Sequence, residues 1–196
     1  MSVASSTGLI ILAAGTSSRL GRPKQLLEYK GKPLLQHAID IAGQFEWGAG
    51  VLVLGANARR IEQKIDPKGL DLIRNEKWEE GIASSIRLGL SHLREKKSDL
   101  HHALFLLSDQ PYLTVEVLRL LLSVHEENKS ITACKYQGQI GVPVILSHAF
   151  FNDLMQLEGD QGAKKIVMNN FDTTSTIPFE GGEVDVDTEE DVKHLD

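Results

Sequence analysis

The sequence has few cysteines, no long apolar run and no excess of positive charge. Cys134 is the single cysteine among 196 residues, so an internal disulfide is excluded and we expect a reducing, cytoplasmic setting. The apolar runs are too short for a membrane span or a signal sequence, which predicts a soluble protein without membrane contact. The formal net charge of −6 argues against a nucleic-acid partner.

Common nucleotide and metal motifs are also missing. The chain contains neither the phosphate-loop pattern GxxxxGK[ST] nor the dinucleotide pattern GxGxxG, and its seven histidines form no HExxH motif. Any catalytic site must therefore be sought in weaker patterns. The length and the apolar content of 41% suit one globular domain over residues 1–196.

Segments of strand and helix character alternate along the chain. Short apolar runs predict strands at residues 9–12, 51–54, 70–73, 103–107 and 131–136. Helical spacing predicts helices at residues 33–45, 58–65, 83–93 and after Thr114, then near 149–156 and 163–168, with a terminal helix from Thr188. This order favours a single-domain, three-layer α/β/α sandwich, Rossmann-like, with a mainly parallel sheet. We expect a nucleotide-binding half at about residues 8–110 and a second half at about 111–196 on the same sheet.

A loop with two glycines and several cations follows the first predicted strand. Residues 9–24 read LIILAAGTSSRLGRPK, so Gly15 and Gly21 lie close to Arg19 and Lys24. Backbone N–H groups and cations at the carboxyl edge of a parallel sheet bind phosphate groups. The loop therefore predicts a polyphosphate site, with an ordinary exposed turn as the alternative.

Acidic residues follow another strand and end the chain. Asp109 comes directly after the strand at 103–107, which places it at the same sheet edge as the loop and makes it a metal candidate. Asp185 and Asp187 are two residues apart, so on a strand they share a face, and either completes a site with Asp109. The alternatives are a turn at Pro111 and a solvated acidic terminus.

Two further segments offer contacts to a ligand. Ser84 or Ser85 either caps the predicted helix or presents a hydroxyl to a base edge. Asp160, in the sequence GDQG at 159–162, either belongs to a tight turn or faces a second metal or the substrate. Trp78 is expected to pack in the interior or to form the floor of a pocket.

Four patterns, in order along nearly the whole chain, resemble the molybdenum cofactor cytidylyltransferase group of the nucleotidyltransferases. They are LAAGxxxRxGxxK at 12–24, SDQP at 108–111, GDxG at 159–162 and DxDTxxD at 185–191. The resemblance implies a nucleotidyltransferase fold and transfer of CMP from CTP to molybdopterin, with release of pyrophosphate. A molybdoenzyme would receive the product.

The same resemblance implies roles for individual residues. Arg19, Lys24 and Asp109 would be catalytic, and Asp109 and Asp187 would hold Mg²⁺ or Mn²⁺. Asp160 and Asp185 are candidates for acceptor binding or a second metal. The nucleotide-binding set would be Leu12, Ala13, Ala14, Gly15, Ser18, Arg19, Lys24, Gly81 and Ser85.

Two positions bear on specificity and on the alternatives. Ala14 favours CTP, because guanylyltransferase relatives typically carry LAGG where this chain carries LAAG. Val142 stands where the family often has a histidine before the proline, which puts any cofactor-holding role of that histidine in doubt here. The alternatives are guanylyl transfer, nucleotidyl transfer to another phosphorylated metabolite, or a non-catalytic molybdopterin chaperone.

Overall fold

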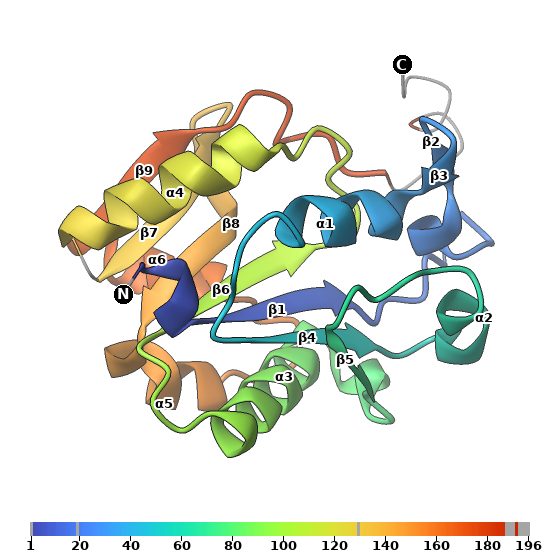
Figure 1. Ribbon diagram of the computed structural model, residues 1–196, viewed down its shortest axis with the longest axis horizontal. Helices are drawn as coiled ribbons and strands as arrows, with labels where there is room; N and C mark the ends of the chain where they lie inside the picture. Colours follow the sequence, from blue (N-terminus) through green and yellow to red (C-terminus); the bar gives the residue numbers. More distant parts are fainter. Residues whose placement is uncertain (1, 19, 129, 187–190, 192–196) are drawn as a thin grey trace.

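A seven-stranded sheet forms the middle layer of the computed structural model, which describes residues 2–18, 20–128, 130–186 and 191. The strand order is β5-β4-β1-β6-β8-β7-β9 (Figure 1). Only β8 runs antiparallel to its neighbours, β6 and β7, and the remaining pairings are parallel. The strands are β1 (Thr7–Ala13), β4 (Ala49–Leu54), β5 (Asp71–Arg74), β6 (His102–Leu107), β7 (Ile131–Tyr136), β8 (Gln139–Ser147) and β9 (Thr174–Pro178).

Helices cover both faces of this sheet. Figure 1 shows α1 and α4 on one side, and α3 and α5 on the other. The helices are α1 (Leu34–Ala42), α2 (Ala58–Glu62), α3 (Ile82–Lys96), α4 (Val115–Asn128), α5 (Phe151–Met155) and α6 (Lys164–Asn169), and β2 (Glu28–Tyr29) pairs with β3 (Lys32–Pro33). Within the described ranges, no helix combines the length and the apolar character needed to span a bilayer.

Alternating side chains of the sheet build two separate cores. Leu9 and Ile11 of β1 belong to a cluster with residues of α1 and α4, whereas Ile10 and Leu12 belong to a cluster with residues of α3 and α5. Successive residues of a strand point to opposite faces, so a strand covered on both sides must be apolar throughout. The three-layer, mainly parallel α/β fold predicted from the sequence is therefore confirmed.

Most predicted elements are present, with shifted ends. The strands at 51–54, 103–107 and 131–136 are confirmed, and Thr114 caps α4 because its Oγ1 accepts a hydrogen bond of 3.2 Å from the Val117 N–H. The predicted helix at 33–45 ends at Ala42, and the segment at 149–156 divides into a 3₁₀ turn (His148–Phe150) and α5.

The C-terminal part departs most from the prediction. The described residues 183–186 lie in no strand, so the strand geometry considered for Asp185 is wrong. The sheet instead ends in β9, which the sequence analysis missed because only Ile177 of this strand is buried. Arg19 and Asp187 lie outside the described residues, and of the helix predicted from Thr188 only residue 191 is described.

Candidate active site

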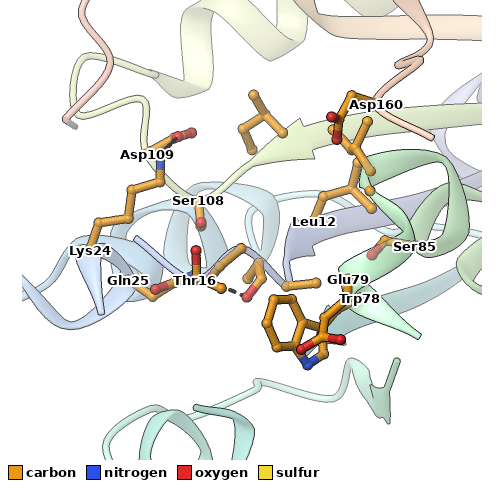
Figure 2. Close-up of a pocket in the computed structure, with 16 residues that line it drawn as sticks. Leu12, Thr16, Lys24, Gln25, Trp78, Glu79, Ser85, Ser108, Asp109 and Asp160 are labelled. Atoms are coloured by element: carbon orange, nitrogen blue, oxygen red, sulfur yellow. Dashed lines mark hydrogen bonds and ion pairs between the residues drawn. The ribbon is translucent and has the colours of Figure 1, made fainter. Parts of the chain in front are cut away.

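A pocket of about 380 Å³ opens at the carboxyl ends of β1 and β6. Parallel α/β sheets bind ligands at this edge, and the volume lies within the range of small-molecule sites. Figure 2 shows Lys24 and Asp109 at one end of the pocket, and Ser85 and Asp160 at the other. The lining comprises Leu12, Ala13, Ala14, Gly15, Thr16, Lys24, Gln25, Trp78, Glu79, Gly81, Ile82, Ser85, Leu107, Ser108, Asp109 and Asp160.

Hydrogen bonds within the chain hold the loop after β1 in a closed shape. The carbonyl oxygen of Ser17 accepts hydrogen bonds from the N–H groups of Leu20 and Gly21, at 3.0 and 3.1 Å. Gln25 is 1% exposed, and its Nε2 donates to the carbonyl oxygens of Ala13 and Gly15, each at 3.1 Å. Gln25, which follows Lys24 in the sequence, therefore stabilises the start of the loop through these two hydrogen bonds.

Lys24 and Asp109 form an ion pair between the loop and the end of β6. Lys24 Nζ contacts Asp109 Oδ2, and both side chains are largely buried. The other carboxylate oxygen, Oδ1, is buried and has no hydrogen-bond partner within the described part of the chain. A buried carboxylate oxygen without a partner carries a desolvation cost that a cation or a proton donor removes.

Gly81 and Gly159 join the other end of the pocket to the C-terminal half. Gly81 precedes α3 with φ +93° and ψ 179°, a region that is essentially restricted to glycine. A Cβ there would overlap the Gly159 carbonyl oxygen and lie 2.6 Å from Asp160 Oδ1. The same carbonyl accepts a hydrogen bond of 3.1 Å from the Ala83 N–H, so the 159–162 turn caps the start of α3.

The two serines of α3 have different surroundings. Ser84 Oγ donates to the carbonyl oxygens of Gly81 and Lys77, at 2.8 and 3.0 Å, and Ser84 does not line the pocket. Ser85 lines the pocket, although only 2% of its surface is exposed. Of the two serines considered as ligand contacts, only Ser85 lies in the wall of this pocket.

Next to Asp109, Gln110 connects the end of β6 to the C-terminal half. Gln110 Nε2 donates to the carbonyl oxygens of Val142 and Gly182, at 3.0 and 3.3 Å. Burial, together with the negative charges of Asp185 and Asp109, raises the pKa of Tyr136 to about 12. The Tyr136 phenol therefore stays protonated to a higher pH than an ordinary tyrosine.

A third apolar cluster brings the C-terminal segment to the loop. Val186 is fully buried against Leu20, Leu27, Tyr29 and Leu34. The flanking Asp185 is exposed and is not part of the pocket lining, and Asp187 lies outside the described residues. The described residues contain no group of three His, Cys, Asp or Glu side chains able to hold a metal.

The pocket gathers most of the predicted site, but not all of it. Gly81, Ser85, Asp109 and Asp160 join the residues of strand β1 and its loop, whereas Ser18 is exposed and does not line the cavity. Six further lining residues were not predicted from the sequence: Thr16, Gln25, Glu79, Ile82, Leu107 and Ser108. Four of them, Thr16, Gln25, Ile82 and Ser108, directly adjoin a predicted site residue in the sequence, and this adjacency was the available signal.

The fold and this pocket define an α/β domain of the nucleotide-binding class. A sheet edge with a glycine-bearing loop, a buried lysine and a buried carboxylate suits a phosphorylated ligand. The sequence profile of the MobA-like NTP transferase domain matches residues 9–174. The chain belongs to this family.

Solved structures and characterised proteins extend the comparison. Rv0371c of Mycobacterium tuberculosis H37Rv superimposes with a TM-score of 0.83 at 29% identity, covering 96% of each chain. The same protein has also been solved in complex with manganese. The molybdenum cofactor cytidylyltransferase of Escherichia coli K12 is 23% identical over 93% of this chain and 91% of its own length.

Other relatives match over part of their own length. The nicotine blue oxidoreductase of Paenarthrobacter nicotinovorans is 34% identical over 63% of this chain, and the bifunctional protein GlmU of Desulfitobacterium hafniense is 30% identical over 78%. This chain spans 59% of the first protein and 31% of the second.

Proposed function

We propose that this protein is a nucleotidyltransferase that transfers CMP from CTP to molybdopterin and releases pyrophosphate. The observation that carries the proposal is the arrangement of Lys24 and Asp109 at one end of the pocket, with one oxygen of the buried carboxylate unpartnered. This end suits a triphosphate and a divalent cation. The other end, between Ser85 and Asp160, suits the base.

The proposed reaction requires no nucleophile from the protein. An oxygen of the acceptor phosphate forms a bond to the α-phosphorus of CTP, while the bond between that phosphorus and the oxygen bridging to the β-phosphate breaks. Pyrophosphate leaves with the bonding electron pair. Phosphoryl transfer depends mainly on positioning and on charge stabilisation, and these are what a closed loop and a buried lysine supply.

Charge is the main obstacle that the residues must offset. Two like unit charges about 4 Å apart repel by about 4 kcal/mol at an effective dielectric constant of 20. Lys24 is held at the phosphate end by Asp109, and Arg19 is proposed to add a second positive charge there.

Asp109 also suits a metal ligand, because Mg²⁺ is usually bound through one or two carboxylates and otherwise by phosphate oxygens and waters. Its buried, unpartnered Oδ1 fits this role. Asp187 is proposed as the second carboxylate, with Asp160 and Asp185 as candidates for acceptor binding or a second metal. Bound Mg²⁺ or Mn²⁺ would supply positive charge to the triphosphate.

The preference for CTP and molybdopterin rests on sequence. Ala14 lines the pocket where guanylyltransferase relatives typically carry glycine, and the Escherichia coli cytidylyltransferase matches over most of both chains. The family match names NTP transfer without an acceptor, so the second candidate is nucleotidyl transfer to another phosphorylated metabolite. The side chain of Val142 is apolar, so any acceptor contact made by the family histidine must come from another residue in this chain.

The test is pyrophosphate release with CTP, UTP, GTP and ATP, each with and without molybdopterin, in the presence of Mg²⁺. We expect release with CTP and stimulation by molybdopterin. Faster release with GTP would replace the cytidylyl assignment by guanylyl transfer, and stimulation only by another phosphorylated acceptor would overturn molybdopterin. Tight molybdopterin binding without release from any nucleotide would indicate a non-catalytic chaperone.

A further inference from the structure

Asn75 lies behind the base end of the pocket and has no role in the site described above. It follows β5 directly, is 4% exposed, and its backbone N–H donates to the Leu54 carbonyl oxygen at 2.7 Å. Its side chain contacts both serines of α3: Nδ2 donates to Ser84 Oγ at 2.8 Å and to Ser85 Oγ at 2.9 Å. A buried amide that reaches the pocket wall in this way is in a position to act on the ligand through Ser85.

The backbone of Lys77 fixes the orientation of this amide. The Lys77 N–H donates to Asn75 Oδ1 at 2.9 Å. A backbone N–H can only donate, so the oxygen of the amide must face Lys77 and the NH₂ group must face the serines. The orientation, which atom positions alone leave ambiguous for an asparagine, is thereby determined by the chain.

The amide in turn fixes the direction of the Ser85 hydroxyl. Because Ser85 Oγ accepts a hydrogen bond from Asn75, its own proton points away from Asn75. Ser84 also accepts from Asn75, but its proton goes to the carbonyl oxygens of Gly81 and Lys77. The described residues offer no acceptor to the Ser85 proton, and Ser85 lines the cavity.

We propose that Asn75 is a positioning residue that makes Ser85 a hydrogen-bond donor toward the pocket, and that the ligand presents an acceptor atom there. The acceptor is a carbonyl oxygen or an unprotonated ring nitrogen of a heterocyclic base. A ligand donor at this place can reach the remaining lone pair of Ser85 Oγ, but it leaves the serine proton without an acceptor, and the cost of this unsatisfied buried donor disfavours the wrong base. This inference rests on the proposed nucleotide-binding function and assigns the hydrogen-bonding character of its base end.

The test compares three single variants by their affinity for CTP, UTP, GTP and ATP, measured by titration calorimetry. Ser85→Ala removes the donor. Asn75→Asp replaces the NH₂ donors by an acceptor oxygen of the same shape, so that both serine hydroxyls turn their protons toward residue 75. Ser84→Ala is the matched control, because Ser84 touches the same amide but sends its proton to carbonyl oxygens.

We expect Ser85→Ala and Asn75→Asp each to weaken binding of the preferred nucleotide about tenfold, and Ser84→Ala to change it less than about twofold. The double variant of Asn75→Asp and Ser85→Ala should bind no more weakly than Ser85→Ala alone. In turnover the loss should appear in KM, with kcat retained.

Three outcomes would overturn the inference. They are unchanged binding by Ser85→Ala, unchanged binding by a folded Asn75→Asp, and additive losses in the double variant. If Asn75→Asp does not fold, the contrast between Ser85→Ala and Ser84→Ala decides. Preference for a nucleotide other than CTP, with these effects intact, would refute the cytidylyl assignment and keep the inference, whereas no binding of any nucleotide would refute both.

Discussion

Replacing Gly81 by alanine tests whether the two halves of the pocket depend on a close backbone contact. The residue has φ +93° and ψ 179°, and holding an alanine in this region costs about 1–3 kcal/mol. The added Cβ would also overlap the Gly159 carbonyl and lie 2.6 Å from Asp160 Oδ1, which adds about 1–3 kcal/mol of overpacking. We expect Gly81→Ala to lower the free energy of unfolding by about 2–6 kcal/mol.

Gly159→Ala is the matched control for this substitution. Gly159 also has a positive φ, +56°, but a Cβ there would meet no atom within 4 Å. An alanine in the left-handed region costs about 1–2 kcal/mol, so this variant should lose only the backbone contribution. The comparison therefore separates strain at a single residue from the collision between segments 78 residues apart in sequence.

Urea denaturation of the two variants and the wild type measures the difference. Calorimetric titration with CTP should show weaker binding by Gly81→Ala, because relief of the overlap moves the Gly159–Asp160 turn away from the start of α3. If Gly81→Ala unfolds at the same urea concentration as Gly159→Ala, the close contact does not exist in solution and the reasoning fails.

Three further predictions concern charge. Asp109→Asn should abolish pyrophosphate release and weaken Mn²⁺ binding while leaving the fold intact, and full turnover would remove Asp109 from the metal site. Lys24→Ala should lower kcat by about 10³-fold, as removal of a charge-stabilising group does in phosphoryl transfer, and a loss below about tenfold would place Lys24 outside the reaction. His125 is fully buried, and burial together with the charge of His102 lowers its pKa to about 4. Between pH 6.5 and about 4 the unfolded chain binds this proton and the folded chain does not, so stability should fall by about 3 kcal/mol as the pH decreases. His125→Asn should flatten that part of the pH profile, and an unchanged slope in urea denaturation at each pH would contradict the assignment.

The sequence alone determined the layers of the fold and the edge that carries the pocket. Continuous apolar runs such as residues 9–12 require cover on both faces, and the alternation with helices leaves few topologies other than a parallel α/β sheet. Gly15 and Asp109 were therefore predictable at one sheet edge, because each closely follows a strand, and Lys24 belongs to the loop that starts at Gly15.

Only the tertiary structure decided which side chains meet and how they are oriented. Asn75 carries no spacing signal, yet the backbone N–H of Lys77 fixes its amide and so the Ser85 proton. Strand geometry was considered for Asp185 and Asp187 because of their spacing, whereas residues 183–186 form no strand and Val186 of this segment enters a cluster with Leu20 and Leu27. The periodicity of a strand or a helix depends only on residues that are close in the sequence, so the sequence alone reveals it. Hydrogen-bond direction and long-range packing depend on groups that the chain brings together only when it folds.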